Sequence, residues 1–130
     1  MAHPNEDLVR ESFAAGERGG MDVLRKQYWT DDIRYHVPGR GPVAGDYEGQ
    51  EQMLGQSART FELTGGTFSA EFHDALGNDE HGVAMLTVHA ERAGKKLNQN
   101  VVLVYHFRDG KIAEVWNHPA DQYAIDEFWS

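Results

Sequence analysis

Hydrophobic residues recur every three to four positions in much of the first half of the chain and every second position in the second half. The first spacing is typical of amphipathic helices and predicts them over residues 5–18, 21–28 and 49–63. The second spacing predicts strands over 67–76, 83–92, 96–107 and 112–118, with an early strand over 33–37. A short segment rich in aromatic residues, 119–129, follows the last strand and is expected to dock on the body.

The two long strands near the C-terminus are joined by a tight turn at Asp109-Gly110. A two-residue hairpin turn of this type needs positive φ angles, which Asp and especially Gly tolerate. The strand before the turn, Val101–Phe107, is rich in β-branched and aromatic residues. A hairpin of this length needs cover on at least one face, and the predicted helices can supply it.

Residues typical of helix ends and loops mark the boundaries of the other predicted elements. Asn5 is placed to cap the first helix and Gly19-Gly20 to end it. The segment Gly39–Gly49 holds Gly, Pro and Asp at high density and is predicted to be a loop. Helices in the first half of the sequence and antiparallel strands in the second half indicate one α+β domain over residues 1–130, with the helices on one face of a curved sheet.

Composition narrows the function. The formal net charge is −9, with 12 basic residues scattered among 21 acidic ones, so nucleic acid is not an expected partner. The chain contains no Cys, which excludes disulfides, thiolate nucleophiles and iron–sulfur clusters. No apolar run approaches the ~20 residues of a membrane span. No secretory signal is recognisable either, so we expect a cytoplasmic protein without a membrane partner.

Several short motifs occur in a characteristic order. Asp31-Asp32 is followed after five residues by Pro38-Gly39, then by a Gly-rich loop, by Asp109–Ile112 (DGKI), and by Glu114 and Trp116 as E-x-W. This order resembles the nuclear transport factor 2-like superfamily, in particular its SnoaL-like and ketosteroid isomerase-like branches. The resemblance implies a cone-shaped, cystatin-like fold, in which a curved antiparallel sheet wraps around three N-terminal helices and leaves an apolar pocket. Relatives include isomerases, polyketide cyclases, hydratase-type enzymes and non-catalytic binding proteins, and they commonly form homodimers.

The resemblance also allows a comparison with the catalytic residues of ketosteroid isomerases. Those enzymes use an Asp base just before the Pro that ends the first strand, a Tyr donor in the first helix and a protonated Asp before the DGK turn. The matching residues here are Val37, Phe13 and Leu103. Because a Val cannot abstract a proton and a Phe cannot donate one, this chain is not expected to be a true ketosteroid isomerase.

Strand alternation divides the sheet residues into an inner face and an outer face. The inner face is predicted to contain Ile33, Tyr35, Val37, Leu86, Val88, Ala90, Gln99, Val101, Leu103, Tyr105, Ala113, Val115 and Asn117. Phe68, Phe72 and Leu76 are predicted to lie in the core. The outer face carries Val102, Val104 and Trp116 and is a predicted homodimer surface.

Polar residues on the inner face are the first candidates for ligand binding. Tyr35, Gln99 and Asn117 are predicted to orient a ligand, because buried hydroxyl and amide groups need hydrogen-bond partners. Apolar ligand contacts are predicted from Val37, Leu103, Phe13, Val101, Val115 and Leu86.

Asp121 has two interpretations. In SnoaL-like cyclases a carboxylate shortly after the E-x-W strand is expected to act as general acid and base, which makes Asp121 the catalytic candidate. Its place after Pro119-Ala120 is also typical of a residue that caps the start of a helix. Neither interpretation involves a metal, because the seven histidines show no ligand spacing of the H-x-H or H-x-x-x-H kind beside a carboxylate.

Together these features predict a small-molecule pocket protein that binds a neutral, largely apolar ligand. If the protein is catalytic, we expect acid–base chemistry without a cofactor, such as an isomerisation or an aldol-type cyclisation. The alternative is a non-enzymatic ligand-binding or interaction module of the same fold. The lack of Asp, Glu and His at the predicted inner strand positions favours this alternative.

Overall fold

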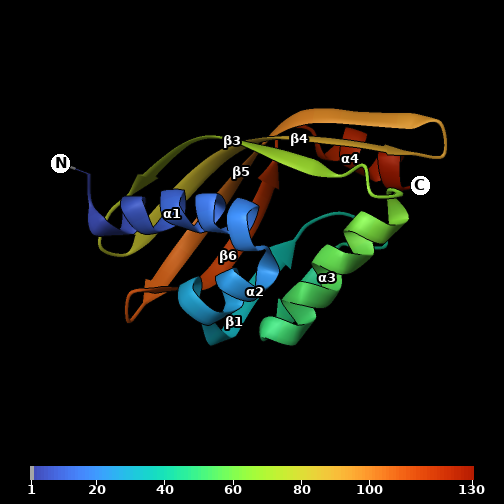
Figure 1. Ribbon diagram of the computed structural model, residues 1–130. Helices are drawn as coiled ribbons and strands as arrows, with labels where there is room; N and C mark the ends of the chain where they lie inside the picture. The colour runs from blue at the N-terminus through green and yellow to red at the C-terminus, as the bar shows by residue number, and fades with distance from the viewer. Residues whose placement is uncertain (1) are drawn as a thin grey trace.

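The computed structural model describes residues 2–130, and its helices and strands follow nearly the predicted order (Figure 1). The helices are α1 (Pro4–Gly19), α2 (Met21–Val23), α3 (Gln50–Leu63) and α4 (Gln122–Trp129), with a π-helical segment, η1 (Leu24–Tyr28), after α2. The strands are β1 (Trp29–Val37), β2 (Gly45–Glu48), β3 (Ser69–Gly77), β4 (His81–Arg92), β5 (Lys95–Arg108) and β6 (Lys111–Pro119).

The six strands form one curved, unclosed sheet in the order β2-β1-β6-β5-β4-β3. Strand β1 pairs with β6 in parallel, whereas the other neighbours are antiparallel. Helix α1 lies across the concave face, and α3 lies beside β1 and the edge strand β2 (Figure 1). The α+β fold predicted from the sequence is confirmed.

Helix α1 is capped two residues earlier than predicted. The Nδ1 atom of His3 accepts a hydrogen bond from the backbone N–H of Asn5, so His3 is the cap and Asn5 lies within the helix. Pro4 suits the first helical position because it has no N–H to leave unpaired. The helix ends as predicted, at Gly20, whose φ of 71° is accessible to glycine without strain.

Strand alternation holds along β4. Every second residue from Gly82 to Ala90 is buried, while the residues between them are half-buried on the outer face. The prediction of an inner face containing Leu86 and Val88 is therefore confirmed for this strand. Regular pairing of β4 with β5 over its whole length keeps the alternation in phase.

Bulges break the same pattern in two other strands. The pairing of β3 shifts between Phe72 and Asp74, and as a result Ala75 is buried with 0% exposure while Leu76 is 55% exposed. The prediction that Leu76 lies in the core is wrong for this reason. In β6 the shift leaves Ala113 unpaired, so the inner position passes from Ala113 to Ile112, which is 2% exposed.

The segment predicted to be a loop, Gly39–Gly49, contains the short edge strand β2. Tyr47 of β2 lies opposite Tyr35 of β1, and its hydroxyl donates a hydrogen bond to the carbonyl of Val43 at 2.7 Å. Only one side of β2 is paired, because it is the edge strand. Edge strands tolerate Gly and Asp, the residue types from which this segment was predicted to be a loop.

The concave face of the sheet has two parts. In one part α1 covers a core that includes Val9 and Ile33, each with 0% exposure, together with Leu86 and Val115. In the other part Val88 and Val101 pack with Phe128 and Trp129 of α4. Burial of each such side chain contributes about 1.5–3 kcal/mol to stability.

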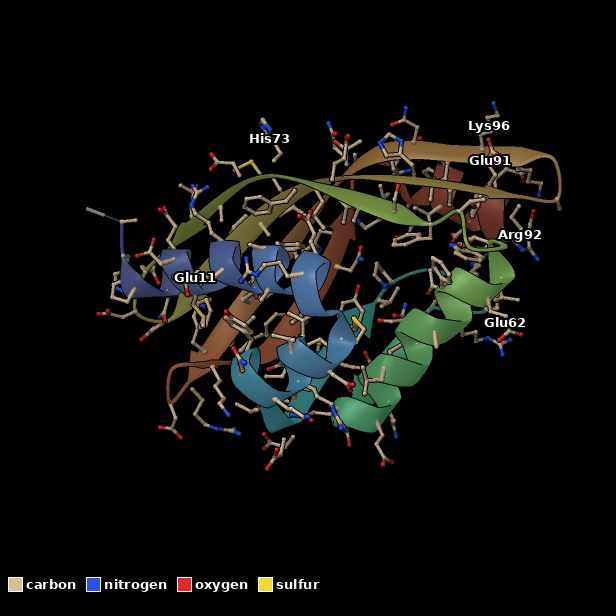
Figure 2. All side chains as sticks on the ribbon, viewed as in Figure 1. Glu11, Glu62, His73, Glu91, Arg92 and Lys96 are labelled. Atoms are coloured by element: carbon tan, nitrogen blue, oxygen red, sulfur yellow. The ribbon has the colours of Figure 1, made fainter. Side chains whose placement is uncertain are left out.

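Charged side chains lie mainly at the surface. Glu11, Glu62 and Lys96 are exposed and project away from the body of the molecule (Figure 2). Within residues 2–130, no helix combines the length and apolarity that crossing a bilayer demands.

A group of polar and aromatic side chains lies on the outer face beside β1. The two ring nitrogens of His36 lie 2.7 Å from a carboxylate oxygen of Asp46 and 2.6 Å from one of Glu114. The His36 ring also stacks on Trp116 at a centroid distance of 5.3 Å. Burial lowers the pKa of His36, but the hydrogen bonds and charges of the two carboxylates raise it by more, so the net pKa lies above the ordinary 6.5.

This raised pKa predicts a pH-dependent contribution to stability. Below the unfolded-state pKa His36 is protonated in both states and its ion pairs stabilise the fold fully; the stabilisation is lost as pH rises through the higher folded-state pKa. We therefore expect the melting temperature of the wild type to exceed that of His36→Gln by more at about pH 5.5 than at about pH 9. The exposed His118→Gln is the matched control, and an equal gap at both pH values would contradict the expectation.

Candidate ligand-binding site

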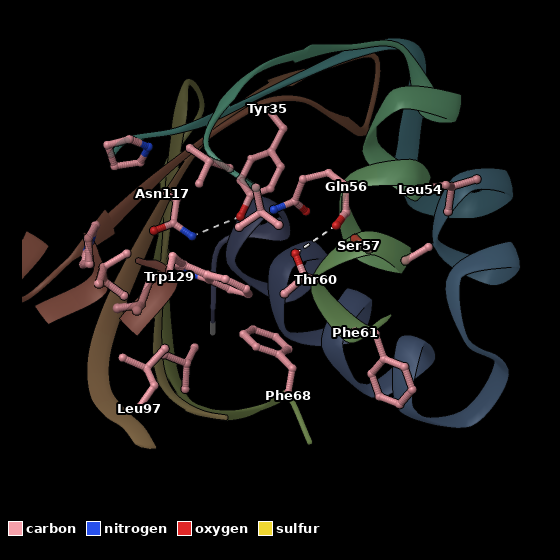
Figure 3. Close-up of a pocket in the computed structure, with 18 of the residues that line it drawn as sticks. Tyr35, Leu54, Gln56, Ser57, Thr60, Phe61, Phe68, Leu97, Asn117 and Trp129 are labelled. Carbon is pink, nitrogen blue, oxygen red and sulfur yellow. Dashed lines mark hydrogen bonds between the residues drawn. The ribbon is translucent and has the colours of Figure 1, made fainter. Parts of the chain in front are cut away.

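A cavity of about 700 Å³ occupies the part of the concave face that α1 does not cover (Figure 3). Strands and helices α3 and α4 both contribute to its walls. The lining consists of Met21, Tyr35, Val37, Pro38, Val43, Leu54, Gln56, Ser57, Ala58, Thr60, Phe61, Phe68, Val88, Leu97, Val101, Asn117, Pro119, Ile125 and Trp129. This volume lies within the range of pockets that hold drug-sized molecules, roughly 300–1,000 Å³.

Helix α3 forms the wall that faces the sheet. Its first turn is held to η1 and to the start of β1, because the side-chain amide of Gln50 donates to the carbonyls of Arg25 and Thr30 at 2.9 and 3.2 Å. The same helix directs Ser57 and Thr60 toward the cavity. Neither residue was among the predicted ligand contacts, although small and polar side chains on the apolar stripe of this helix were a signal for them.

Helix α4 closes another side of the cavity. Trp129 lines the cavity and lies under the guanidinium group of Arg92, 5.7 Å from the ring centroid. The loop before β2 packs tightly against it: a Cβ atom on Gly41 would lie only 2.6 Å from the Cβ of Trp129. This close approach requires glycine at position 41 and sets the position of the Trp129 ring.

Two polar side chains meet on the sheet wall. The Nδ2 atom of Asn117 in β6 donates a hydrogen bond of 3.0 Å to the hydroxyl oxygen of Tyr35 in β1. The parallel pairing of the two strands brings these residues together, since Tyr35 lies opposite Val115 in the register. Burial raises the pKa of Tyr35 above its ordinary 10.0, with partial opposition from the Asn117 hydrogen bond, so the hydroxyl stays protonated at neutral pH.

The structure separates the sequence-predicted contacts into two sets. Tyr35, Val37, Val101 and Asn117 all line the cavity. The remaining apolar candidates, Leu86, Val115, Phe13 and Leu103, lie outside the lining and pack in or against the core. Phe13 stacks on Phe72 with a centroid distance of 4.9 Å. Alternation identifies the face of a strand, but α1 fills one part of that face and leaves only the other part open.

Gln99 and Asp121 also lie outside the lining and contact each other. The Gln99 amide group donates to the backbone carbonyl of Asp121 and accepts from its N–H, at 3.2 and 3.1 Å. The Asp121 carboxylate accepts a hydrogen bond of 3.1 Å from the backbone N–H of Ala124, and the residue is exposed. Asp121 thus caps α4, which is the second of the two interpretations that the sequence allowed.

The cavity lining is electrically neutral. Among the described residues 2–130, those that line it include no Asp, Glu, His, Lys or Arg, and Tyr35 is their one ionisable group. The same part of the chain contains no group of three His, Asp or Glu side chains arranged to hold a metal ion. The polar atoms available to a ligand are therefore hydroxyl and amide groups.

A second hollow, of about 630 Å³, lies at the outer face near the start of β1 and, unlike the cavity, is lined largely by charged side chains. Its lining includes Arg34 and Arg108, each of which is already paired with a carboxylate. Arg34 lies 3.1 Å from Glu114, and Arg108 contacts Asp32. With its cations neutralised in this way, this hollow offers little attraction to an anionic ligand.

Comparison with known proteins agrees with this architecture. The family model described as the SnoaL-like domain matches residues 9–115, which is most of the chain. The chain belongs to the SnoaL-like family. The nuclear transport factor 2-like superfamily and the SnoaL-like branch suggested by the sequence are confirmed, and a small-molecule-binding type of protein follows from this membership.

Relatives of this SnoaL-like protein cover almost its whole length. Rv0034 of Mycobacterium tuberculosis, an uncharacterized protein, is 32% identical over 125 residues, which are 95% of each chain. The structure of Bal32a, from a soil-derived mobile gene cassette, is 35% identical, with a TM-score of 0.89 over 99% of this chain and 98% of Bal32a. A protein with a cystatin-like fold from Xanthomonas campestris is 26% identical, with a TM-score of 0.85 over 95% and 96% of the two chains.

The capping geometry of Asp121 predicts the effect of its substitution. Asp121→Ala should destabilise the SnoaL-like domain by about 1 kcal/mol, because the N–H of Ala124 loses its acceptor, whereas Asp121→Asn should cost only a few tenths. Urea denaturation followed by circular dichroism measures both values. If Asp121→Ala were as stable as the wild type, the cap would contribute nothing and the role of Asp121 would have to lie elsewhere.

Proposed function

We propose that the cavity binds a neutral, largely apolar small molecule and that binding, without proton transfer, is the function of this protein. The proposed contacts are Tyr35, Val37, Val101 and Asn117 on the sheet and Ser57 and Thr60 on α3. No cofactor is part of this proposal. The observation that carries it is the neutral lining of a cavity large enough for a drug-sized ligand.

Electrostatics supports a neutral ligand. A charged ligand that enters an apolar cavity loses its hydration, and this loss costs several kcal/mol unless an opposite charge compensates it. Because the described lining residues carry no charged side chain, the cavity offers no such compensation. A neutral molecule avoids this cost and gains from contact with Phe68, Leu97 and Trp129.

The alternative is a cofactor-free isomerase or cyclase, which membership of the SnoaL-like family favours. Acid–base catalysis works best with a group whose pKa lies near the operating pH, and the pKa of Tyr35 is raised from 10.0 by burial. Tyr35 is therefore better suited to donate a hydrogen bond than to accept a proton. Deuterium exchange next to the carbonyl of a bound ketone, followed by NMR, distinguishes the two functions, since binding alone leaves the buffer rate unchanged.

Reducing the size of the cavity tests the proposal. Titration with Nile red, a neutral dye that fluoresces in apolar surroundings, should saturate at one dye per chain in the wild type. Ser57→Phe places an aromatic ring in the cavity and should weaken binding by about tenfold or more, because the dye and the ring compete for the same volume.

The matched control is Glu62→Phe, which adds the same ring at an exposed position of the same helix. This variant should bind the dye as the wild type does. Equal affinities of all three proteins would locate the dye elsewhere and overturn the proposal.

We also propose that the protein forms a homodimer through the outer face of the sheet. Val102, Val104 and Trp116 are only half-buried there, and the rings of His36 and His106 pack on Trp116. Apolar side chains on an open sheet face favour association with a second surface. A second copy of the same face is the partner that fits, because a two-fold axis places the apolar side chains of one copy against those of the other.

Introducing a charge on this face tests the dimer. Sedimentation velocity at micromolar concentration should give twice the chain mass for the wild type and one chain mass for Val104→Glu, since burial of an unpaired carboxylate opposes association. Tyr123→Glu is the control, because Tyr123 is 89% exposed on α4, which packs on the inner face. A wild-type protein that sediments as a single chain would contradict the proposal.

A further inference from the structure

The polar groups of the cavity are not evenly distributed. Tyr35 and Asn117 lie together on the sheet wall, and Gln56 projects from α3 near them (Figure 3). Phe68 and Leu97 lie toward the other end, where the labelled side chains are apolar. The cavity therefore has a polar end and an apolar end, and it suits a ligand with one polar group on an apolar body.

The hydrogen bonds at the polar end leave the proton of the Tyr35 hydroxyl without an acceptor. The hydroxyl oxygen of Tyr35 accepts from Asn117, and within residues 2–130 the Tyr35 hydroxyl donates no hydrogen bond of its own. Tyr35 is shielded from bulk solvent, and its remaining accessible surface belongs to the cavity lining. A hydroxyl in such a place needs an acceptor, and the cavity is where one can bind.

The hydroxyl of the neighbouring Tyr47 differs from that of Tyr35 because the protein supplies its acceptor. Tyr47 lies directly opposite Tyr35 in the β1–β2 register, and its hydroxyl donates to the carbonyl of Val43 at 2.7 Å. Its donor is therefore satisfied by the protein, and Tyr47 does not belong to the cavity lining. Of these two neighbouring tyrosines, only Tyr35 has a proton to offer to a ligand.

We infer that the ligand is a neutral ketone whose carbonyl oxygen accepts a hydrogen bond from the Tyr35 hydroxyl, with Asn117 holding that hydroxyl in place. This inference rests on the proposed binding function and specifies the chemistry of its ligand. A carbonyl oxygen matches the Tyr35 hydroxyl because it accepts a hydrogen bond and brings no charge into the neutral lining. The hydrogen bond from Asn117 orients the Tyr35 oxygen and increases its strength as a donor.

Two probes of the same shape test the inference. 2-Acetylnaphthalene carries a ketone, and 2-isopropenylnaphthalene replaces the carbonyl oxygen by a CH₂ group. Tyr35→Phe should weaken binding of the ketone by roughly five- to tenfold and leave the alkene unchanged, because only the ketone loses a hydrogen bond. Tyr47→Phe, which removes the same atom from the adjacent strand, should change neither affinity.

The infrared carbonyl band of the bound ketone gives a second measurement, which does not depend on affinity. A hydrogen bond from Tyr35 lowers the stretching frequency below its value in an alkane solvent, and Tyr35→Phe should restore the higher value. Binding of both probes with no frequency shift, or equal weakening of both by Tyr35→Phe, would overturn the inference while the proposed function stands. Failure of the wild type to bind either probe would overturn the proposed function as well.

Discussion

Strands β1 and β6 lie side by side although most of the chain separates them. Their parallel hydrogen bonding joins the mainly helical first half of the chain to the antiparallel hairpins of the second half. The hydrogen bond between Tyr35 and Asn117, 82 residues apart in sequence, exists only because of this pairing. The same pairing brings His36 beside Glu114 on the outer face. Loop-closure entropy opposes so distant a contact, and burial of Ile33 and Val115 offsets that cost.

The neutrality of the cavity follows from how the two faces of the sheet are used. Successive side chains of β1 point to opposite faces, so that Tyr35 faces the cavity while His36 meets its carboxylates outside. Ionisable groups are thereby kept on the side where solvent and ion pairs compensate their charge. The cavity lining contains groups that form hydrogen bonds without exchanging protons at neutral pH.

The sequence predicted the fold class, most element boundaries and four of the lining residues, because alternation along uninterrupted strands reports a face directly. It could not show where along that face α1 ends and the cavity begins, since this depends on helix packing. Leu86 packs in the core that α1 covers, whereas Val88, two residues later on the same face, lines the cavity. It also missed Ser57 and Thr60, whose side chains become a wall only once α3 is docked. Local chemistry was easier to predict, as the capping role of Asp121 illustrates.

The bulge in β3 makes the length of that strand as consequential as its composition. Because two residues there face one on β4, removing a single residue near His73 would return the strand to strict alternation. Ala75 would then stay opposite Ala84 and keep its inward place, so this deletion would leave the packing on α1 unchanged. A deletion in the regularly paired part of β3 would instead exchange its inner and outer faces, so the bulge is where this strand tolerates a change of length.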